Sequence, residues 1–385
     1  MTKRIVHVIA DLNIGGAELM LKRLVLSFIN HPTYTHSVIS LTGLGAVGAQ
    51  LRNAGVDVHS LNMVSAASFP SAFWRLIRLL RTLKPAIVQT WMYHADFIGG
   101  FAGGLLGCKV IWGIRSTGIP QGPGALTWWL VRVNALTSYF IPHKIVCCAN
   151  SAKQFHAALG FAARKLIFIP NGYDFSQAAL NRVDRNFVRQ SLGFSDADIV
   201  IGAVGRFDPL KDFQNFVKAA VLVVSVCPAA RFLMVGRGLD ANNKTLAAWV
   251  AAEGIQDKFV LVGEQPATAP YLSAMDVFCL SSRHEAFPNV VVEAMAAGLP
   301  CVVTDAGDAS AVVGNCGLVV STSDPGALGR GLMQFCQLAA AERNLIGKNA
   351  MQRVRAKYDI GFICSQYEIL YDFLTLPKTE KTSLS

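Results

Sequence analysis

The chain has 385 residues, of which 52% are hydrophobic and only 16% charged, and its formal net charge is +10. This composition excludes an intrinsically disordered protein, and the length predicts about two or three domains. Residues 1–180 contain 16 Lys and Arg against 5 Asp and Glu, whereas residues 181–385 contain 19 against 20. The basic first half indicates a face for an anionic partner such as nucleic acid, anionic lipid or a phosphorylated substrate.

Short apolar runs separated by helix-length segments predict the β-strands. In the first half they are Ile5–Ile9, Val38–Leu41, Val56–Leu61, Ala86–Thr90, Val110–Ile114, Ile145–Cys148 and Ile167–Ile169. In the second half they are Ile199–Val204, Arg231–Val235, Phe259–Val262, Val277–Leu280, Cys301–Thr304 and Gly317–Val320. Nearly continuous apolar strands that alternate with helices indicate parallel sheets covered on both faces.

The strand pattern lapses between the two halves and resumes with a second strand, turn and helix. The fold class predicted is therefore α/β, with two Rossmann-like doubly wound domains. The first domain covers residues 1–178, a linker follows over 179–198, the second domain covers 199–358, and 359–385 form a terminal helix with a polar tail. Ligands of such sheets bind at the carboxyl ends of the strands, so we expect the functional residues in the loops that follow strands.

The strongest motif is the segment Ser281–Pro300, which follows a predicted strand and opens a helix near Pro288 and Asn289. Free backbone N–H groups at a helix start attract phosphate. Glu285 lies in the loop and Glu293 lies one turn into the helix. A carboxylate can accept hydrogen bonds from two hydroxyls, which suits a sugar or a ribose diol. Alternatively, Glu293 is merely a favourable charge at a helix start.

Two cations follow the first strand of the second domain. Arg206 and Lys211 offer the planar fork and the point charge that a diphosphate needs, although two cations in a loop are often simply solvated. In the first domain, Gly15 and Gly16 follow the first strand and would let the backbone approach a ligand closely. They do not form a dinucleotide-binding GxGxxG motif.

A histidine and an arginine lie at the corresponding edge of the first domain. His94 and Arg115 each follow a predicted strand there, although a lone His is more often structural. Asp196-Ala-Asp198 has the DxD pattern of metal–diphosphate sites, but it precedes a strand, and we interpret it as a turn. The nine cysteines form no CxxC pair and lie mostly in apolar runs, as expected for reduced thiols of a cytosolic protein.

These motifs, in this order, resemble those of the GT-B glycosyltransferases of family GT4, and the resemblance covers almost the whole chain. Its most specific element is the spacing of Glu285 and Glu293, supported by the Arg206/Lys211 pair, Gly15–Glu18 and Ile169–Gly172. One departure is Ala286, where the family usually has Gly. Because Ala does not adopt positive φ cheaply, we expect an adjusted loop and altered sugar choice rather than lost activity.

The resemblance implies a role for each motif residue. Arg206 and Lys211 would bind the donor diphosphate, Glu293 the ribose and Glu285 the transferred sugar, while His94 would lie near the reacting sugar carbon. Gly16 would approach the phosphates, and backbone N–H groups of Phe287–Asn289 would help. The implied catalytic residues are His94, Glu285, Arg206 and Lys211, and the implied donor-binding residues are Gly15, Gly16, Arg206, Lys211, Glu285, Phe287, Pro288, Asn289 and Glu293.

The resemblance also implies the reaction and its partners. We expect a metal-independent, retaining transferase without a cofactor, which moves a sugar from a nucleotide sugar (a UDP-sugar) to a polyprenyl-diphosphate-linked or other glycan acceptor in bacterial polysaccharide, O-antigen or capsule assembly. The C-terminal helix would pack back on the first domain. Alternatives are a related nucleotide-sugar epimerase, a non-catalytic sugar-nucleotide sensor and a nucleic-acid-binding protein. No nucleic-acid motif accompanies the basic half, so no nucleic-acid partner is expected.

The basic half also contains two candidate membrane-contact segments. In 71–84, Arg75, Arg78 and Arg81 recur among apolar residues, as in a basic amphipathic helix at a membrane surface. Alternatively, its apolar stripe packs on the sheet. The second candidate, 126–140, contains two Trp. We expect a cytoplasmic protein that is peripheral on the inner face of the cytoplasmic membrane, where the surface is anionic. The pattern of the apolar stretch Phe97–Ile114 favours a helix followed by a strand, so no transmembrane helix is expected.

Overall fold

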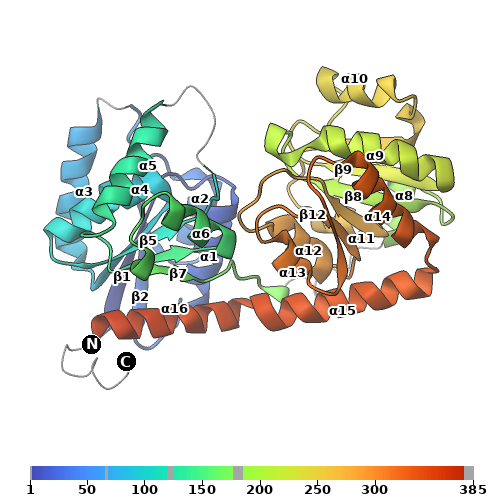
Figure 1. Cartoon of the computed structure of the whole chain (residues 1–385). Helices are drawn as coiled ribbons and strands as arrows, with labels where there is room; N and C mark the ends of the chain where they lie inside the picture. Colours follow the sequence, from blue (N-terminus) through green and yellow to red (C-terminus); the bar gives the residue numbers. More distant parts are fainter. Residues whose placement is uncertain (1, 66–67, 119–124, 177–184, 377–385) are drawn as a thin grey trace. The chain divides into compact units, whose positions relative to one another are not determined.

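The computed structural model describes residues 2–65, 68–118, 125–176 and 185–376. The chain forms two compact units. Unit 1 consists of Met1–Tyr173 and Tyr358–Ser385, and unit 2 of Asp174–Lys357. Each unit contains one sheet and its own helices (Figure 1). Of the predicted linker, residues 185–198 belong to unit 2, whereas 179–184 and the tail from residue 377 lie outside the described residues.

Unit 1 contains a seven-stranded parallel sheet in the order β3-β2-β1-β4-β5-β6-β7. Its strands are β1 (Lys3–Ile9), β2 (Tyr34–Ser40), β3 (Asp57–Ser60), β4 (Ile87–Trp91), β5 (Lys109–Ile114), β6 (Lys144–Cys147) and β7 (Leu166–Phe168). Its α-helices are α1 (Gly16–Ser27), α2 (Gly45–Asn53), α3 (Phe69–Leu83), α4 (Met92–Leu105), α5 (Ala125–Thr137), α6 (Asn150–Ala158) and α16 (Ile360–Thr375).

Helices cover both faces of this sheet. Because successive strand residues point to opposite faces, Ile5 and Ile9 of β1 pack with α1, α2 and α16, whereas Val6 and Val8 pack with α3 and α4. Helix α16 contacts α1 and contributes six buried side chains to unit 1 (Figure 1). The expected return of the C-terminal helix to the first domain is therefore confirmed.

Unit 2 contains a six-stranded parallel sheet in the order β10-β9-β8-β11-β12-β13. Its strands are β8 (Ile199–Val204), β9 (Ala230–Val235), β10 (Phe259–Gly263), β11 (Val277–Leu280), β12 (Cys301–Thr304) and β13 (Gly317–Val320). Its α-helices are α8 (Arg185–Ser191), α9 (Phe213–Val226), α10 (Lys244–Ala252), α11 (Ala269–Ala274), α12 (Asn289–Ala296), α13 (Ala309–Val313) and α14 (Pro325–Gln337), and α15 (Ala340–Tyr358) ends at the boundary with unit 1.

The predicted doubly wound α/β fold is confirmed. Every predicted strand is present, and β8, β11, β12 and β13 have the predicted bounds. The largest difference is at β2, which begins at Tyr34 rather than Val38 because the polar residues Thr35, His36 and Ser37 pair with β1. The apolar stretch Phe97–Ile114 forms most of α4 and all of β5, and within the described ranges no helix is long and apolar enough to span a bilayer.

Candidate functional site

The cations predicted to bind a diphosphate follow β8 at the carboxyl edge of the unit 2 sheet. Lys211 ends a short 3-10 helix, Pro209–Lys211, whose start is capped by Asp208. The Arg206 side chain is 59% exposed and donates to Asp208 Oδ2 at 2.7 Å. Burial opposes ionisation of Asp208, but the hydrogen bonds from Arg206 and Leu210 N outweigh it and lower the Asp208 pKa. Arg206 thus presents a guanidinium to solvent while a nearby carboxylate orients it.

Lys211 and Glu285 form an ion pair at this edge. Lys211 Nζ lies 2.6 Å from Glu285 Oε1, and the hydroxyl of Ser282 donates to the same oxygen at 2.7 Å. The Lys211 side chain is 24% exposed and that of Glu285 is 11% exposed. The loops after β8 and β11 therefore place a cation and a carboxylate next to each other, partly screened from water.

A second ion pair fixes these two loops against each other. Asp212 adopts a left-handed φ of 48° between the 3-10 helix and α9. The guanidinium of Arg283 donates to both carboxylate oxygens of Asp212, at 2.6 and 3.0 Å. Arg283 N also donates to Leu210 O at 2.8 Å, and the hydroxyl of Ser281 to Lys211 O at 2.8 Å. The positions of Lys211 and Glu285 are therefore coupled through their neighbours.

The loop after β12 supports the backbone of Glu285 and Ala286. Gly307 has a φ of 59°, and a Cβ there would lie 2.1 Å from Glu285 O, so only glycine fits. Asp308 N donates to Ala286 O at 3.1 Å. Ala286 itself is not among the residues with positive φ. The departure from the family's Gly therefore causes no backbone strain here.

Helix α12 begins where the sequence predicts it, near Pro288 and Asn289. Pro288 is the N-cap and Asn289 the first helical residue. Pro288 has no N–H to offer, and Asn289 N donates to Phe287 O at 2.9 Å. Pro288 therefore cannot supply an N–H group, whereas the expected help from the N–H groups of Phe287 and Asn289 stays a prediction. Glu293 is half-buried within α12, and Thr268 Oγ1 lies 3.5 Å from its Oε2.

At the carboxyl edge of the unit 1 sheet, Gly15 caps α1 and Gly16 is its first residue. The buried carboxylate of Glu18 lies against Gly15, where an added Cβ would come within 2.3 Å of Glu18 Oε2. Burial raises the Glu18 pKa to about 7, although its own backbone N–H opposes the shift. His94 lies in the first turn of α4 and is exposed, and partial desolvation lowers its pKa. Sequence reasoning assigned roles to Gly15, Gly16 and His94, whereas it included Glu18 in the Gly15–Glu18 motif without a role.

Arg115 has a structural role in unit 1. Its guanidinium donates to Asn171 Oδ1 at 2.9 Å and to the Tyr367 hydroxyl at 2.8 Å, and it stacks 4.3 Å from the centre of the Trp91 ring. It thereby joins the loops after β5 and β7 to α16. No local sequence signal identifies this contact, because Arg115 and Tyr367 lie 252 residues apart.

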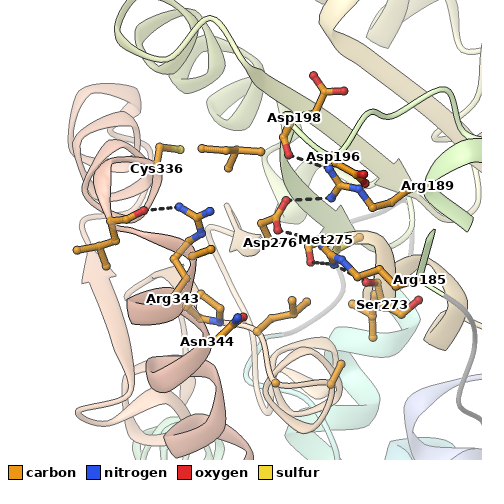
Figure 2. Close-up of a pocket in the computed structure, with 18 of the residues that line it drawn as sticks. Arg185, Arg189, Asp196, Asp198, Ser273, Met275, Asp276, Cys336, Arg343 and Asn344 are labelled. Atoms are coloured by element: carbon orange, nitrogen blue, oxygen red, sulfur yellow. Dashed lines mark hydrogen bonds and ion pairs between the residues drawn. The ribbon is translucent and has the colours of Figure 1, made fainter.

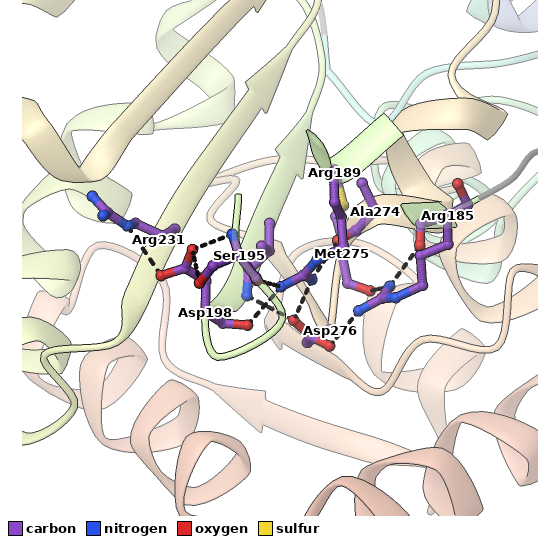
Figure 3. A network of polar contacts seen from close by, with 10 residues as sticks. Arg185, Arg189, Ser195, Asp198, Arg231, Ala274, Met275 and Asp276 are labelled. Carbon is purple, nitrogen blue, oxygen red and sulfur yellow. Dashed lines mark hydrogen bonds and ion pairs between the residues drawn. The ribbon is translucent and has the colours of Figure 1, made fainter. Parts of the chain in front are cut away.

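Unit 2 also has a cavity of about 750 Å³ at the opposite, amino edge of its sheet (Figure 2). Arg185 and Arg189 both pair with Asp276, which precedes β11. Figure 3 shows how the polar network continues to Asp198, which accepts from Ser195 N at 2.7 Å. The DxD segment is thus a turn, as predicted. The two arginines also donate to backbone carbonyls, so this network fixes the chain rather than offering charge to a ligand.

Comparisons with known proteins agree with this geometry. Residues 14–177 match the family model described as Glycosyltransferase Family 4, and residues 198–337 match the model described as Glycosyl transferases group 1. The chain belongs to the GT4-type glycosyltransferases. Its two sheets give it the GT-B fold. Within the described ranges, no group of three or more His, Cys, Asp and Glu side chains could hold a metal ion.

Two curated relatives and one solved structure illustrate the similarity. N-acetyl-alpha-D-glucosaminyl L-malate synthase of Bacillus anthracis is 29% identical over 51% of this chain and 52% of its own. UDP-Gal:alpha-D-GlcNAc-diphosphoundecaprenol alpha-1,3-galactosyltransferase of Escherichia coli is 26% identical over 62% of this chain and 63% of its own. The alignments thus span only part of these relatives. HepE from Anabaena, solved with UDP, superposes with a TM-score of 0.81 at 19% identity, over 95% of this chain and 99% of its own.

Proposed function

We propose that this GT4-type chain is a retaining glycosyltransferase, which transfers a sugar from a UDP-sugar to a lipid-linked saccharide in bacterial surface-polysaccharide assembly. The observation that carries the proposal is the ion pair of Lys211 and Glu285. In a nucleotide sugar, one oxygen joins the diphosphate to the sugar, so the groups that bind these two parts must be neighbours. Lys211 fits the diphosphate and Glu285 the sugar hydroxyls.

The comparisons support the choice of donor and acceptor. HepE from Anabaena was solved with UDP and with UDP-glucose, and the name of the Escherichia coli relative specifies a UDP-sugar and a diphosphoundecaprenol-linked acceptor. A lipid-linked acceptor would place the reaction at a membrane, and we propose the anionic inner face of the cytoplasmic membrane.

The proposed chemistry breaks the bond between the sugar's anomeric carbon and the diphosphate oxygen. The acceptor hydroxyl attacks that carbon from the face of the leaving group, and its proton passes to the departing diphosphate. Lys211 and Arg206 would stabilise the negative charge that develops there, together with the positive end of α12. These groups could supply the stabilisation without a metal or cofactor. Glu293 would bind the ribose, and His94 would lie near the reacting carbon.

Release of UDP from a panel of UDP-sugars, with and without polyprenyl-lipid extract, tests this proposal. We expect turnover with one sugar and only with extract. Replacement of Arg206 or Lys211 by Ala should weaken UDP binding by roughly 10- to 100-fold, because each removes a charged hydrogen bond to phosphate. Lys218→Ala, which removes an exposed cation from α9, is the matched control. Unaltered UDP affinity in both site variants would contradict the site assignment.

A further inference from the structure

Helix α5 and the turn after it expose large apolar side chains. The exposed fraction is 61% for Trp129, 68% for Leu136 and 82% for Phe140. Trp129, Val133 and Leu136 recur every three or four residues, so they share one face of the helix, and Phe140 lies in the turn that follows it. We call this set the α5 stripe, and its members are Trp129, Val133, Leu136 and Phe140.

The residues of the α5 stripe are not the ones that pack α5 against the rest of unit 1. Val131, Asn134 and Ala135 are buried on the other side of the helix, and Asn134 Nδ2 donates to Tyr93 O in α4 at 2.9 Å. A helix packed on one side normally shows polar residues on the other. A contiguous exposed apolar patch on a folded unit therefore marks an interaction surface.

Helix α3 contributes charge to the same layer and one strongly exposed apolar side chain, Trp74, which is 65% exposed. Its apolar positions Leu76 and Leu80 are buried in the core, which confirms the interpretation that its apolar stripe packs on the sheet. Arg75, Arg78 and Arg81 are exposed. Of the groups expected to contact a membrane surface in this helix, the arginines and Trp74 therefore remain exposed.

The segment that forms α3, α4 and α5 is strongly basic in sequence. Residues 69–140 contain seven Lys and Arg and a single acidic residue, Asp96, which is only 1% exposed. Helix α4 contacts both α3 and α5, and Figure 1 shows these helices in one layer, so their outward side chains point away from the same face of the sheet. Arg132 lies over the Trp128 ring at 4.9 Å, and Lys165 Nζ donates to Tyr139 O at 2.7 Å.

Exposed apolar side chains together with positive charge favour one of the possible partners. A second copy, in a two-fold contact through the stripe, would bring arginines against arginines. Nucleic acid would use the charge but not Val133 or Leu136. An anionic bilayer uses both properties, because it attracts cations at its surface and accepts apolar side chains at the headgroup boundary.

We propose that the α5 stripe inserts into an anionic lipid bilayer while the arginines of α3 bind its headgroups. This deepens the proposed function, on which it rests only for the presence of a membrane-bound acceptor. Sedimentation of the full chain with vesicles of phosphatidylcholine and phosphatidylglycerol tests it. Replacement of Trp129, Leu136 and Phe140 by Ser should lower the partition coefficient at least about tenfold, at low and at high salt. Replacement of Arg75, Arg78 and Arg81 by Gln should lower it about fivefold per residue at low salt only.

The control variant replaces Leu345, Phe362 and Ile369 by Ser, which are 61%, 54% and 69% exposed elsewhere on the chain. It should bind vesicles like the wild type, and all variants should keep the wild-type circular dichroism and UDP affinity. Unchanged vesicle binding by the stripe variant would overturn the proposal. So would a wild-type dimer that the stripe variant abolishes without any vesicle binding, or stripe-dependent binding of RNA alone. Stripe-dependent vesicle binding without turnover of any UDP-sugar would instead retain the surface and reject the proposed function.

Discussion

Because Glu285 forms an ion pair with Lys211, we expect the loss of Glu285 and the loss of Glu293 to change UDP affinity differently. Removing Glu285 frees the cation that we assign to the diphosphate. We therefore expect Glu285→Ala to leave UDP affinity unchanged or to raise it by up to about tenfold, and to lower turnover by about 100-fold or more. Glu293→Ala should weaken UDP itself by about tenfold, because it removes the acceptor for the ribose hydroxyls.

Calorimetry with UDP and a UDP-release assay separate these effects. Glu285→Gln keeps the size of the side chain and some hydrogen bonding but removes the charge, so it should match Glu285→Ala in UDP affinity and exceed it in turnover. An equal loss of UDP affinity in the Glu285 and Glu293 variants would contradict the division of roles.

Glu18 makes the stability of unit 1 dependent on pH. Burial raises its pKa from 4.5 to about 7. The unfolded chain loses this proton near pH 4.5 and the folded chain only near pH 7, so the folded state is progressively destabilised as the pH rises between these values. Glu18→Gln removes the effect. We expect its free energy of unfolding, relative to the wild type, to rise by about 2 kcal/mol between pH 5.5 and pH 8.5.

Urea denaturation at both pH values measures this difference. Glu253→Gln, which removes an exposed carboxylate from unit 2, provides the control and should follow the wild type at both. A stability difference for Glu18→Gln that is the same at pH 5.5 and 8.5 would show that Glu18 ionises in the folded chain as it does in the unfolded chain.

At the scale of secondary-structure elements, the sequence correctly predicts the features that depend on local residue patterns, such as the bounds of strands. The strands β8, β11, β12 and β13 have the predicted bounds because each is a short, mainly apolar run bounded by turns or loops. The loops after β8 and β11 could be proposed as the site because they follow strands that are recognisable in the sequence. The contact between these loops could not be predicted, because Lys211 and Glu285 lie 74 residues apart and their pairing depends on tertiary structure. The start of α12 was predicted near Pro288 and Asn289, but which of them is the N-cap was left open because both suit a helix terminus.

Helix α16 is attached to unit 1 by buried polar contacts as well as apolar packing. The Tyr371 hydroxyl donates to Gln89 Oε1 at 2.6 Å, and both side chains are fully buried. Tyr371→Phe leaves that oxygen without a donor from α16, so we expect a loss of about 1–3 kcal/mol in the free energy of unfolding. Urea denaturation measures it, with Tyr139→Phe as the control on an exposed tyrosine. Equal stability of the two variants would show that water replaces the lost donor.

At the scale of the whole molecule, the chain passes from unit 1 to unit 2 after Tyr173 and returns at Tyr358. Unit 2 is therefore one continuous segment with its own core, and it contains Arg206, Lys211 and the two carboxylates of the proposed donor site. Unit 1 is discontinuous. Its core includes buried side chains of α16 such as Ile363, which the first segment lacks.

This connectivity predicts that the two units differ in their ability to fold alone. The fragment 174–357 should fold and bind UDP within about tenfold of the full chain, because every side chain assigned to the diphosphate, ribose and sugar hydroxyls lies within it. Of the implied donor-binding residues, it lacks only Gly15 and Gly16. The fragment 1–173 should not fold, since without α16 it exposes the apolar surface that this helix covers. Adding a peptide of residues 358–376 should restore its circular dichroism. Cooperative unfolding of 1–173 alone would mean that α16 only covers a finished domain, whereas loss of UDP binding by a folded 174–357 would require donor contacts from unit 1.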